Sequence, residues 1–279
     1  MNYTTIISVP ELAACMGDRE CIVFDCRHDL VDTGLGRRAY AHTHIPAARF
    51  LHLDEDLSGP KTGANGRHPL PDPARLCARL SALGMNNSQQ VIAYDASGGY
   101  YAARLWWLLR WLGHNRAAVL DGGWDAWLQA GNGVEARTPA ATPGNFSGTP
   151  LDHTVDARTI LMQIEQPALH LVDARSADRF RGENETLDPV GGHIPGALNR
   201  FFKNNLRADG CFKHAAELRQ DFSALLGEFP PSKVVHQCGS GVTACHNLLA
   251  MEIGGLPGSR LYPGSWSEWC SDPRRPVAR

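Results

Sequence analysis

Residues 234–249 read Val-Val-His-Gln-Cys-Gly-Ser-Gly-Val-Thr-Ala-Cys-His-Asn-Leu-Leu. The pattern predicts a buried strand that ends at Cys238, a short loop with two glycines, and a helix that begins near Thr243. A thiol in such a loop lies beside the unpaired N–H groups and the positive dipole end of the helix, which stabilise an anion. Because the thiolate is the reactive form of cysteine, we interpret Cys238 as a nucleophile.

The composition is that of an ordinary globular protein with room for one large or two ordinary domains. The chain has 279 residues, of which 43% are hydrophobic and 20% charged. Its net charge of −2 gives no electrostatic reason to expect a nucleic acid or a membrane as partner. We see no export signal and no run of apolar residues that could span a membrane, so we expect a cytoplasmic protein. With no export signal and no regular spacing, the eight cysteines are expected to be reduced thiols. They form no C-x-x-C pair, so zinc is not expected, and we expect no other cofactor.

The second half of the chain repeats landmarks of the first half in the same order. The matched segments are 23–27 with 171–175, 44–48 with 193–197, 91–95 with 234–238, and 122–127 with 263–269. A period of this size indicates the duplication of a whole domain. We therefore expect one domain over residues 1–135 and another over 151–279. Residues 136–150, rich in Pro, Gly, Ser and Thr, are expected to be the linker.

Each half alternates short apolar runs with helical patterns. Strands are expected over 22–24, 91–94, 117–120, 169–172, 233–236 and 259–262. Helices are expected over 73–83, 100–112, 123–130, 156–165, 214–226 and 243–253. This alternation predicts the α/β class, with a mainly parallel sheet and helices on both faces in each domain. Sites in such sheets lie beyond the carboxyl ends of the strands, where Cys238 is expected.

The first half carries no cysteine at the position that corresponds to Cys238. Asp95 occupies it, followed by Ala-Ser-Gly-Gly, so the loop keeps its glycines but lacks a thiol. We therefore expect the first domain to be a catalytically inactive copy.

The loop after Cys238 suits an anionic sulfur atom. Gly239 and Gly241 allow successive N–H groups to point at one centre, while Ser240 and Thr243 add hydroxyl donors. A ring of this kind has room for the extra sulfur of a persulfide. Phosphatases with a Cys-x5-Arg loop need an arginine six residues after the cysteine, but here that residue is Ala244. Phosphoryl transfer is therefore disfavoured.

These features resemble the tandem-domain rhodanese family of sulfurtransferases over essentially the whole chain. The segments that carry the resemblance are Asp-Ala-Arg at 173–175, His-Ile-Pro-Gly-Ala at 193–197, the loop at 238–244 and Gly-Ser-Trp-Ser-Glu-Trp at 264–269. The resemblance implies two rhodanese-like domains. It also implies covalent catalysis, in which Cys238 takes a sulfur atom from a donor and passes it to an acceptor.

The loop Cys-Gly-Ser-Gly-Val-Thr-Ala is similar to that of the family's 3-mercaptopyruvate sulfurtransferases. Members that use thiosulfate typically carry Arg-Lys after the cysteine, whereas Gly239 and Ser240 are uncharged. The resemblance therefore favours 3-mercaptopyruvate as donor, with release of pyruvate and transfer to a thiol or cyanide. A thioredoxin-like dithiol is one candidate acceptor. Thiosulfate remains an alternative donor, and a non-enzymatic persulfide or redox sensor is the alternative from another functional class.

The resemblance also assigns roles to residues around the cysteine. Arg179 matches the family's substrate-binding arginine, with an exposed surface arginine as the alternative. The family's second arginine corresponds to Asp188 here, so Arg181 is the candidate to replace it. Backbone groups of the loop are expected to contact the donor, and the residues concerned are Gly239, Gly241, Val242 and Thr243.

A proton relay is the remaining role that the resemblance implies. His68 matches a family histidine that acts with Ser240, and Asp54 matches the carboxylate that orients it. An exposed loop histidine and a solvated turn, respectively, are the alternatives for these two positions.

Several other polar residues are expected to be structural. His44 and His193 occur in both halves and are therefore not specific to the cysteine. Arg175 is expected to pair with carboxylates near the strand end. His236 is expected to pack against a helix.

Overall fold

The computed structural model describes residues 2–140, 142–165 and 167–279, and the chain forms two compact units. The first unit runs to Gly59 and continues over Pro71–Asp152 and Ala208–Cys211; the second contains Pro60–Leu70, His153–Arg207 and Phe212–Arg279. Segment 60–70 thus belongs to the unit that is built mostly from the other half of the sequence. Within the described part of the chain, no helix has the length and apolar character to cross a membrane.

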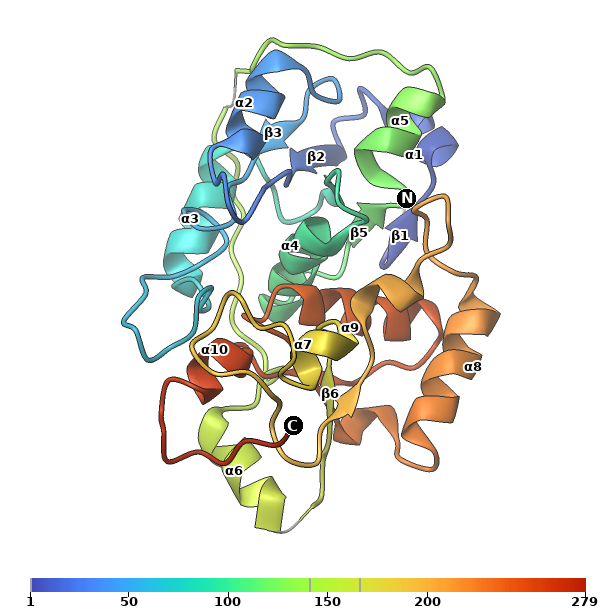
Figure 1. Ribbon diagram of the computed structural model, residues 1–279. Helices are drawn as coiled ribbons and strands as arrows, with labels where there is room; N and C mark the ends of the chain where they lie inside the picture. Colours follow the sequence, from blue (N-terminus) through green and yellow to red (C-terminus); the bar gives the residue numbers. More distant parts are fainter. Residues whose placement is uncertain (1, 141, 166) are drawn as a thin grey trace. The chain divides into compact units, whose positions relative to one another are not determined.

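The first unit contains a five-stranded parallel sheet in the order β1-β5-β4-β2-β3 (Figure 1). The strands are β1 (Ile6–Ile7), β2 (Cys21–Asp25), β3 (Arg49–Phe50), β4 (Gln90–Tyr94) and β5 (Ala117–Leu120). The three central strands β2, β4 and β5 agree with the predicted runs. The two edge strands have only two residues each, which is too short for a periodic pattern to be recognised.

The helices of the first unit are α1 (Val9–Cys15), α2 (Leu35–His42), α3 (Pro73–Ala82), α4 (Tyr100–Trp111) and α5 (Gly123–Gln129). The sequence predicted α3, α4 and α5 but neither α1 nor α2. Helix α3 begins where local chemistry favours it, because the Asp72 side chain accepts a hydrogen bond from the Arg75 amide and Pro73 occupies the first position.

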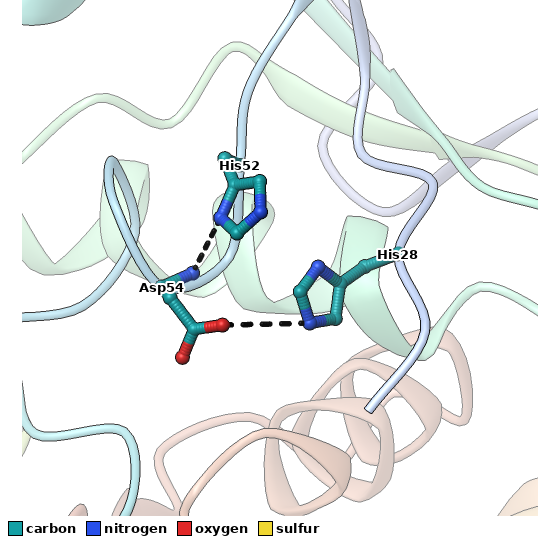
Figure 2. Close-up of side chains that lie close together, drawn as sticks. All are labelled: His28, His52 and Asp54. Atoms are coloured by element: carbon teal, nitrogen blue, oxygen red, sulfur yellow. Dashed lines mark hydrogen bonds and ion pairs between the residues drawn. The ribbon is translucent and has the colours of Figure 1, made fainter. Parts of the chain in front are cut away.

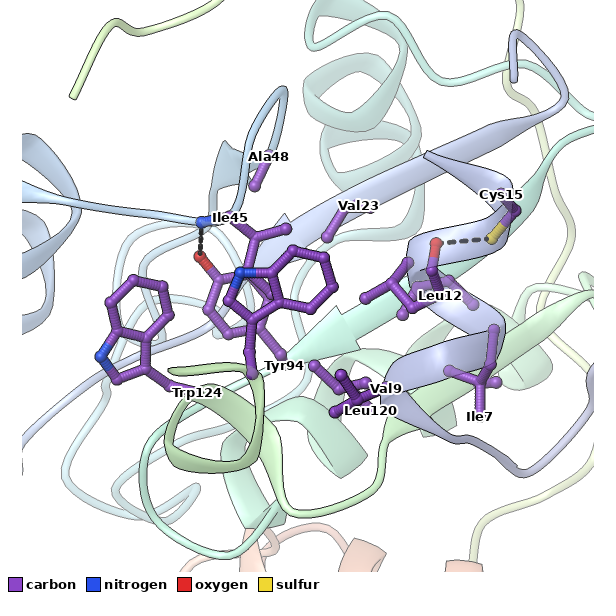
Figure 3. Packing of buried hydrophobic residues seen from close by; sticks show 13 residues of the cluster. Ile7, Val9, Leu12, Cys15, Val23, Ile45, Ala48, Tyr94, Leu120 and Trp124 are labelled. Atoms are coloured by element: carbon purple, nitrogen blue, oxygen red, sulfur yellow. Dashed lines mark hydrogen bonds between the residues drawn. The ribbon is translucent and has the colours of Figure 1, made fainter. Parts of the chain in front are cut away.

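One face of this sheet packs against α1 and α5. Tyr94 of β4 lies in a buried cluster with Leu12 and Trp124 from these helices (Figure 3), and Ile92 of the same strand belongs to that cluster. The Tyr94 hydroxyl donates a hydrogen bond to Asp25 at 2.6 Å and accepts one from the Ile45 amide at 3.2 Å. The buried phenol is therefore satisfied, as an apolar core requires of its polar groups.

The expected linker lies along the first unit over its described residues. The Gly144 amide donates to the Ser81 carbonyl at 2.8 Å, and the Phe146 amide donates to that of Met85 at 3.1 Å. A Cβ atom at Gly144 would lie 2.0 Å from the Met85 oxygen, so only glycine allows this approach. Residue 141, which falls within the expected linker, lies outside the described residues.

The second unit contains a four-stranded parallel sheet in the order β7-β6-β8-β9. Its strands are β6 (His170–Asp173), β7 (Leu198–Asn199), β8 (Val234–Gln237) and β9 (Arg260–Leu261). Its helices are α6 (Ala157–Glu165), α7 (Ala177–Phe180), α8 (Ala215–Leu226), α9 (Thr243–Ile253) and α10 (Ser265–Trp269), with 3₁₀ turns at Phe202–Asn205 and Pro231–Lys233. The predicted α6, α8 and α9 are present, whereas α7, α10 and β7 were not predicted.

Helices cover both faces of this second sheet. Val235 of β8 lies in a buried cluster with Ile160 of α6 and Trp266 of α10. The next residue, His236, contacts Met251 of α9 and the ring of Phe222 in α8. Because successive strand residues point to opposite faces, these contacts place α6 and α10 on one face and α8 and α9 on the other. The predicted α/β arrangement is therefore confirmed.

Candidate active site

Cys238 follows the last residue of β8 and lies five residues before α9. Its side chain is buried, with 2% of the residue exposed, and its Sγ accepts a hydrogen bond from the Gly241 amide at 3.1 Å. Gly241 has φ +77°, and a Cβ atom there would lie 2.4 Å from the Pro263 oxygen. Glycine is thus required at 241 to turn an N–H group towards the sulfur.

Helix α10 holds the loop from the other side. The Cys238 amide donates to the Ser265 hydroxyl at 3.1 Å, and the Cys238 carbonyl accepts from the Trp266 amide at 2.9 Å. The Gly239 carbonyl accepts from the Ser267 amide at 3.0 Å. These bonds fix the backbone on both sides of the sulfur, so the loop is ordered before any donor binds.

Ser240 and His68 form a buried pair beside the cysteine loop. The Ser240 hydroxyl lies 2.7 Å from His68 Nδ1, and less than a tenth of either residue is exposed. His68 belongs to segment 60–70, which is part of the second unit. The structure therefore brings together two residues that the resemblance linked, and the exposed-loop alternative for His68 does not apply.

Arg179 lies at the end of the short helix α7 and is held by two carboxylates. Its Nε and Nη2 atoms donate to Glu185 at distances of 2.8 to 3.0 Å, and Nη2 lies 3.5 Å from Asp188. Burial opposes the ionisation of Glu185, but amides of Leu187 and Asp188 together with Arg179 hold its pKa below the ordinary value. The guanidinium is within 4 Å of the position that a Cβ atom at Gly239 would take.

Arg67 is a residue near the loop that the sequence reasoning missed. Its Nη1 donates to Asp188, and its Nη2 lies 2.7 Å from the position of a Cβ atom at Gly239. Burial raises the pKa of Asp188, and the guanidinium of Arg67 acts in the opposite direction. One signal was available, because Arg67 directly precedes His68 in the run Gly-Arg-His-Pro.

The remaining candidates for donor binding differ in their surroundings. Val242 is buried just before α9, and Thr243 is the half-buried first residue of that helix. Arg181 instead pairs with Glu183 through two hydrogen bonds of 2.7 and 2.8 Å, and its side chain is 53% exposed. Its described bonds thus direct it to solvent-exposed Glu183, and the structure gives no support to Arg181 as the replacement for the family's second arginine.

Asp54 lies in the first unit, beside two histidines (Figure 2). Its carboxylate is 3.7 Å from His28 Nε2, and its amide donates to His52 Nδ1 at 3.1 Å. Within the described part of the chain, these three residues are the one group that could hold a metal ion. However, His52 Nε2 also lies 2.8 Å from the Thr33 carbonyl, so both its nitrogens already have backbone partners. The orienting role expected for Asp54 stays a prediction.

Residues expected to be structural have structural partners. Arg175 bonds to Asp173 through Nε and Nη2 and to the Gly192 carbonyl at 2.7 Å. His236 Nε2 lies 3.0 Å from the Met251 sulfur of α9, and burial lowers its pKa to about 3. His193 Nδ1 bonds to the Phe180 carbonyl at 2.8 Å, as His44 Nδ1 does to that of Tyr40 at 2.7 Å.

Comparisons with known proteins agree with this architecture. The rhodanese-like domain matches the chain twice, over residues 8–130 and 156–272. A probable 3-mercaptopyruvate sulfurtransferase from Pseudomonas aeruginosa is 48% identical over 281 aligned residues, covering 100% of this chain and 99% of that protein. A putative thiosulfate sulfurtransferase from Mycobacterium tuberculosis is 37% identical, covering 98% and 96%.

A solved structure shows the same likeness. The 3-mercaptopyruvate sulfurtransferase from Leishmania major superimposes with a TM-score of 0.84 at 32% identity, over 95% of this chain and 74% of that one. Both the domain match and the identities extend over nearly the whole sequence. The chain therefore belongs to the rhodanese-like family, contains the family's domain twice, and is a sulfurtransferase.

Proposed function

We propose that this sulfurtransferase moves a sulfane sulfur from 3-mercaptopyruvate to a thiol or to cyanide, through a persulfide on Cys238. The observation that carries the proposal is the position of Cys238 Sγ. It lies at the carboxyl end of β8, within 3.1 Å of the Gly241 N–H and at the start of α9. An anionic sulfur at this point is stabilised by the amide and by the helix dipole.

In the first half-reaction, the Cys238 thiolate attacks the thiol sulfur of 3-mercaptopyruvate. A new S–S bond forms and the C–S bond of the donor breaks, with its electron pair left on the pyruvate enolate. The donor's thiol proton goes to that carbon, so pyruvate and an anionic persulfide result. Dividing the transfer into two steps in this way is covalent catalysis.

In the second half-reaction, the acceptor attacks the outer sulfur of the persulfide. The S–S bond breaks and the Cys238 thiolate returns, while cyanide becomes thiocyanate or a thiol becomes a new persulfide. A thioredoxin-like dithiol is the protein acceptor that we propose. Because donor and acceptor use the same cysteine in turn, ping-pong kinetics are expected.

Ser240 and His68 are proposed to carry the proton of the first half-reaction. Their hydrogen bond of 2.7 Å supports this role, since a proton relay needs groups within hydrogen-bond reach. Histidine is the side chain that exchanges protons near neutral pH. Asp54 is proposed to orient this pair, and the first domain, with Asp95 at the cysteine position, is proposed to be catalytically inactive.

The choice of donor rests on charge. The loop from Cys238 to Ala244 contains no lysine or arginine, so it offers no side-chain cation to a dianion. Arg179 donates to Glu185 through Nε and Nη2, and its Nη1 atom lies 3.7 Å from the position of a Cβ atom at Gly239, where it can donate to one carboxylate. Thiosulfate is the second candidate donor, because the guanidinium groups of Arg67 and Arg179 both lie near Gly239 and bring positive charge to the loop.

The deciding experiment measures thiocyanate formation from cyanide with each donor at matched concentrations. We expect kcat/KM for 3-mercaptopyruvate to exceed that for thiosulfate by about tenfold or more, equivalent to about 1.4 kcal/mol of transition-state discrimination. Mass spectrometry of the protein after donor addition should show one added sulfur on Cys238. A preference for thiosulfate would overturn the donor assignment. Labelling of Cys238 without turnover would favour a persulfide sensor.

A further inference from the structure

Two guanidinium groups approach the cysteine loop at Gly239. A Cβ atom at this glycine would lie 2.7 Å from Arg67 Nη2 and 3.5 Å from Arg179 Nη2. The Gly239 carbonyl is turned to the Ser267 amide of α10, so its position is set by the backbone. The residue next to the nucleophile therefore carries no side chain, and the space beside it is bordered by two arginines from other segments.

Arg67 and the residues on both sides of it contact other segments of the second unit. Its own amide donates to the Ser267 hydroxyl at 3.0 Å, and the next residue, His68, bonds to Ser240. The preceding Gly66 has φ +84°, and a Cβ atom there would lie 2.7 Å from the Gly264 oxygen. Such a close approach is open only to glycine, so segment 60–70 presents Arg67 in one fixed place.

The ion pair between Arg67 and Asp188 is asymmetric. The Asp188 side chain is 3% exposed, whereas that of Arg67 is 29% exposed. Asp188 thus holds Nη1 from the protein interior, while Nη2 of the same guanidinium faces the cysteine loop. The Nη2 atom of Arg67 is therefore placed where it can meet a ligand bound beside Gly239.

The charged side chains around the loop form one network. Arg175 pairs with Asp173 and Glu185, Arg179 with Glu185 and Asp188, and Arg67 with Asp188, so three cations meet three carboxylates. A donor with one carboxylate could accept hydrogen bonds from Arg67 Nη2 and Arg179 Nη1, which both lie near Gly239. Arginine forks bind a carboxylate with short, charge-assisted hydrogen bonds.

We propose that Arg67 is the second donor-binding cation of this enzyme, held in place by Asp188, and that together with Arg179 it binds the carboxylate of an α-keto thiol donor. The inference rests on the proposed function and deepens it. It also gives Asp188 a role, because this buried carboxylate holds an arginine from segment 60–70 beside the loop. Arg67 is thus a specificity-determining residue, and Asp188 is a positioning residue.

The test compares Arg67→Gln and Arg67→Lys with the control Arg274→Gln, at an exposed arginine of the same unit that pairs with Asp272. In Arg67→Gln we expect KM for 3-mercaptopyruvate to rise by about tenfold to hundredfold with kcat little changed, since a lost charge-assisted fork affects donor affinity. Arg67→Lys keeps the positive charge but lacks the planar pair of N–H donors, so its KM should lie between those of the unsubstituted enzyme and Arg67→Gln. Arg274→Gln should match the unsubstituted enzyme. Asp188→Asn should raise KM less than Arg67→Gln does, because the Arg67 charge remains.

A second measurement separates this inference from the proposed function. Pyruvate is titrated into Cys238→Ser protein with and without Arg67→Gln, and binding is followed by calorimetry. Loss of pyruvate affinity with Arg67→Gln supports the inference even if 3-mercaptopyruvate is not turned over, an outcome that would refute only the proposed donor. Equal pyruvate affinity with and without Arg67→Gln would overturn the inference. So would a fall in kcat and Tm for both Arg67 variants with unchanged KM, because that result indicates a structural role.

Discussion

The loop at 95–99 in the first unit and the loop at 238–242 in the second have the same length and a glycine at the same position, but their backbones differ just before the helix, where Gly99 has φ +91° and Val242 has φ −92°. Each follows a central strand and leads into a helix that begins five residues after the first loop residue. Gly98 and Gly241 occupy corresponding positions, and both have φ +77°. The loops differ at their first residue, which is Asp95 in one and Cys238 in the other.

The Asp95 carboxylate fills its loop completely. One oxygen accepts from the amides of Ser97 and Gly99 at 2.7 and 2.9 Å, and the other accepts from Tyr101 and Ala102 at 2.8 and 2.9 Å. Burial raises the pKa of this carboxyl, while the four N–H donors favour its ionised form. The loop backbone is therefore a binding site for a negative charge, occupied here by the protein's own side chain.

In the second loop, a backbone N–H group faces a sulfur atom instead of a carboxylate. Cys238 Sγ is a single atom with the Gly241 amide at 3.1 Å, in place of the two oxygens and four amides of the first loop. The comparison suggests how an outer sulfur would be stabilised, because convergent N–H groups favour an anion wherever they are not already satisfied. In the first loop, the Asp95 carboxylate already accepts the hydrogen bonds of the corresponding amides.

The largest effect is expected when the cysteine of the second loop is replaced by the aspartate that the first loop carries at the corresponding position. In Cys238→Asp, the carboxylate should take up the loop amides as Asp95 does, with Tm close to that of the unsubstituted protein. Sulfur transfer should fall by at least about 10³-fold because the nucleophile is gone. Cys238→Ser, which removes the thiol without adding a carboxylate, is the control and should be equally inactive. Sulfur transfer that survives in Cys238→Ser, measured as thiocyanate, would exclude Cys238 as the sulfur carrier.

A second substitution tests the first loop by removing its anion. Asp95→Ala leaves four buried amides without an acceptor, and we expect the free energy of unfolding to fall by about 3 kcal/mol. The activity of the folded protein should be retained, since the proposed chemistry uses the other loop. Urea denaturation measures the first quantity and the thiocyanate assay the second. The matched control is Asp152→Ala, an exposed aspartate of the same unit. Equal stability of the two variants would contradict the view of Asp95 as the loop's anion.

The smallest effect is expected on the acid dependence of the free energy of unfolding, and it comes from a residue in one of the two strands that lead to the loops. His236 in β8 corresponds to Ala93 in β4, and burial lowers the pKa of His236 to about 3. Below about pH 6 the unfolded chain takes up a proton at this position that the folded chain does not. The stability from this group is therefore present above pH 6.5 and is lost as the pH falls towards 3, by about 1.4 kcal/mol per pH unit.

His236→Leu should flatten this acid dependence of the free energy of unfolding, measured by urea denaturation between pH 6 and 4. His42→Gln, at an exposed position in the first unit, is the control and should leave the slope unchanged. If both variants keep the slope of the unsubstituted protein, other groups cause the acid sensitivity and His236 is not a source of it.

Local sequence patterns were sufficient for much of the fold. The apolar runs of β4 and β8 and the helices α4 and α9 appear where periodicity predicted them, because these elements are long enough to repeat their pattern. The two-residue strands β1, β3 and β7 and the short α7 and α10 were not predicted. Elements of that length are formed by pairing and packing with distant residues, which no local window contains.

The site was accessible from sequence only in part. Cys238, its glycines and its helix lie within one short stretch, and the pairing of His68 with Ser240 followed from family resemblance. The position of Arg67 could not be inferred from that resemblance, and Arg181 was expected to be the second donor-binding cation. Arg181 bonds to its near neighbour Glu183 instead, while Arg67 reaches Asp188 from 121 positions earlier in the chain.

The sequence by itself therefore determined the α/β class, the duplication and the loop that surrounds one cysteine, because each can be recognised from the residue pattern of short segments. Only the tertiary structure decided which charges stand beside that loop. Segment 60–70 joins the second unit through contacts such as that of His68 with Ser240, 172 positions apart. Such contacts depend on packing between residues that are distant in the sequence, which a local pattern does not contain.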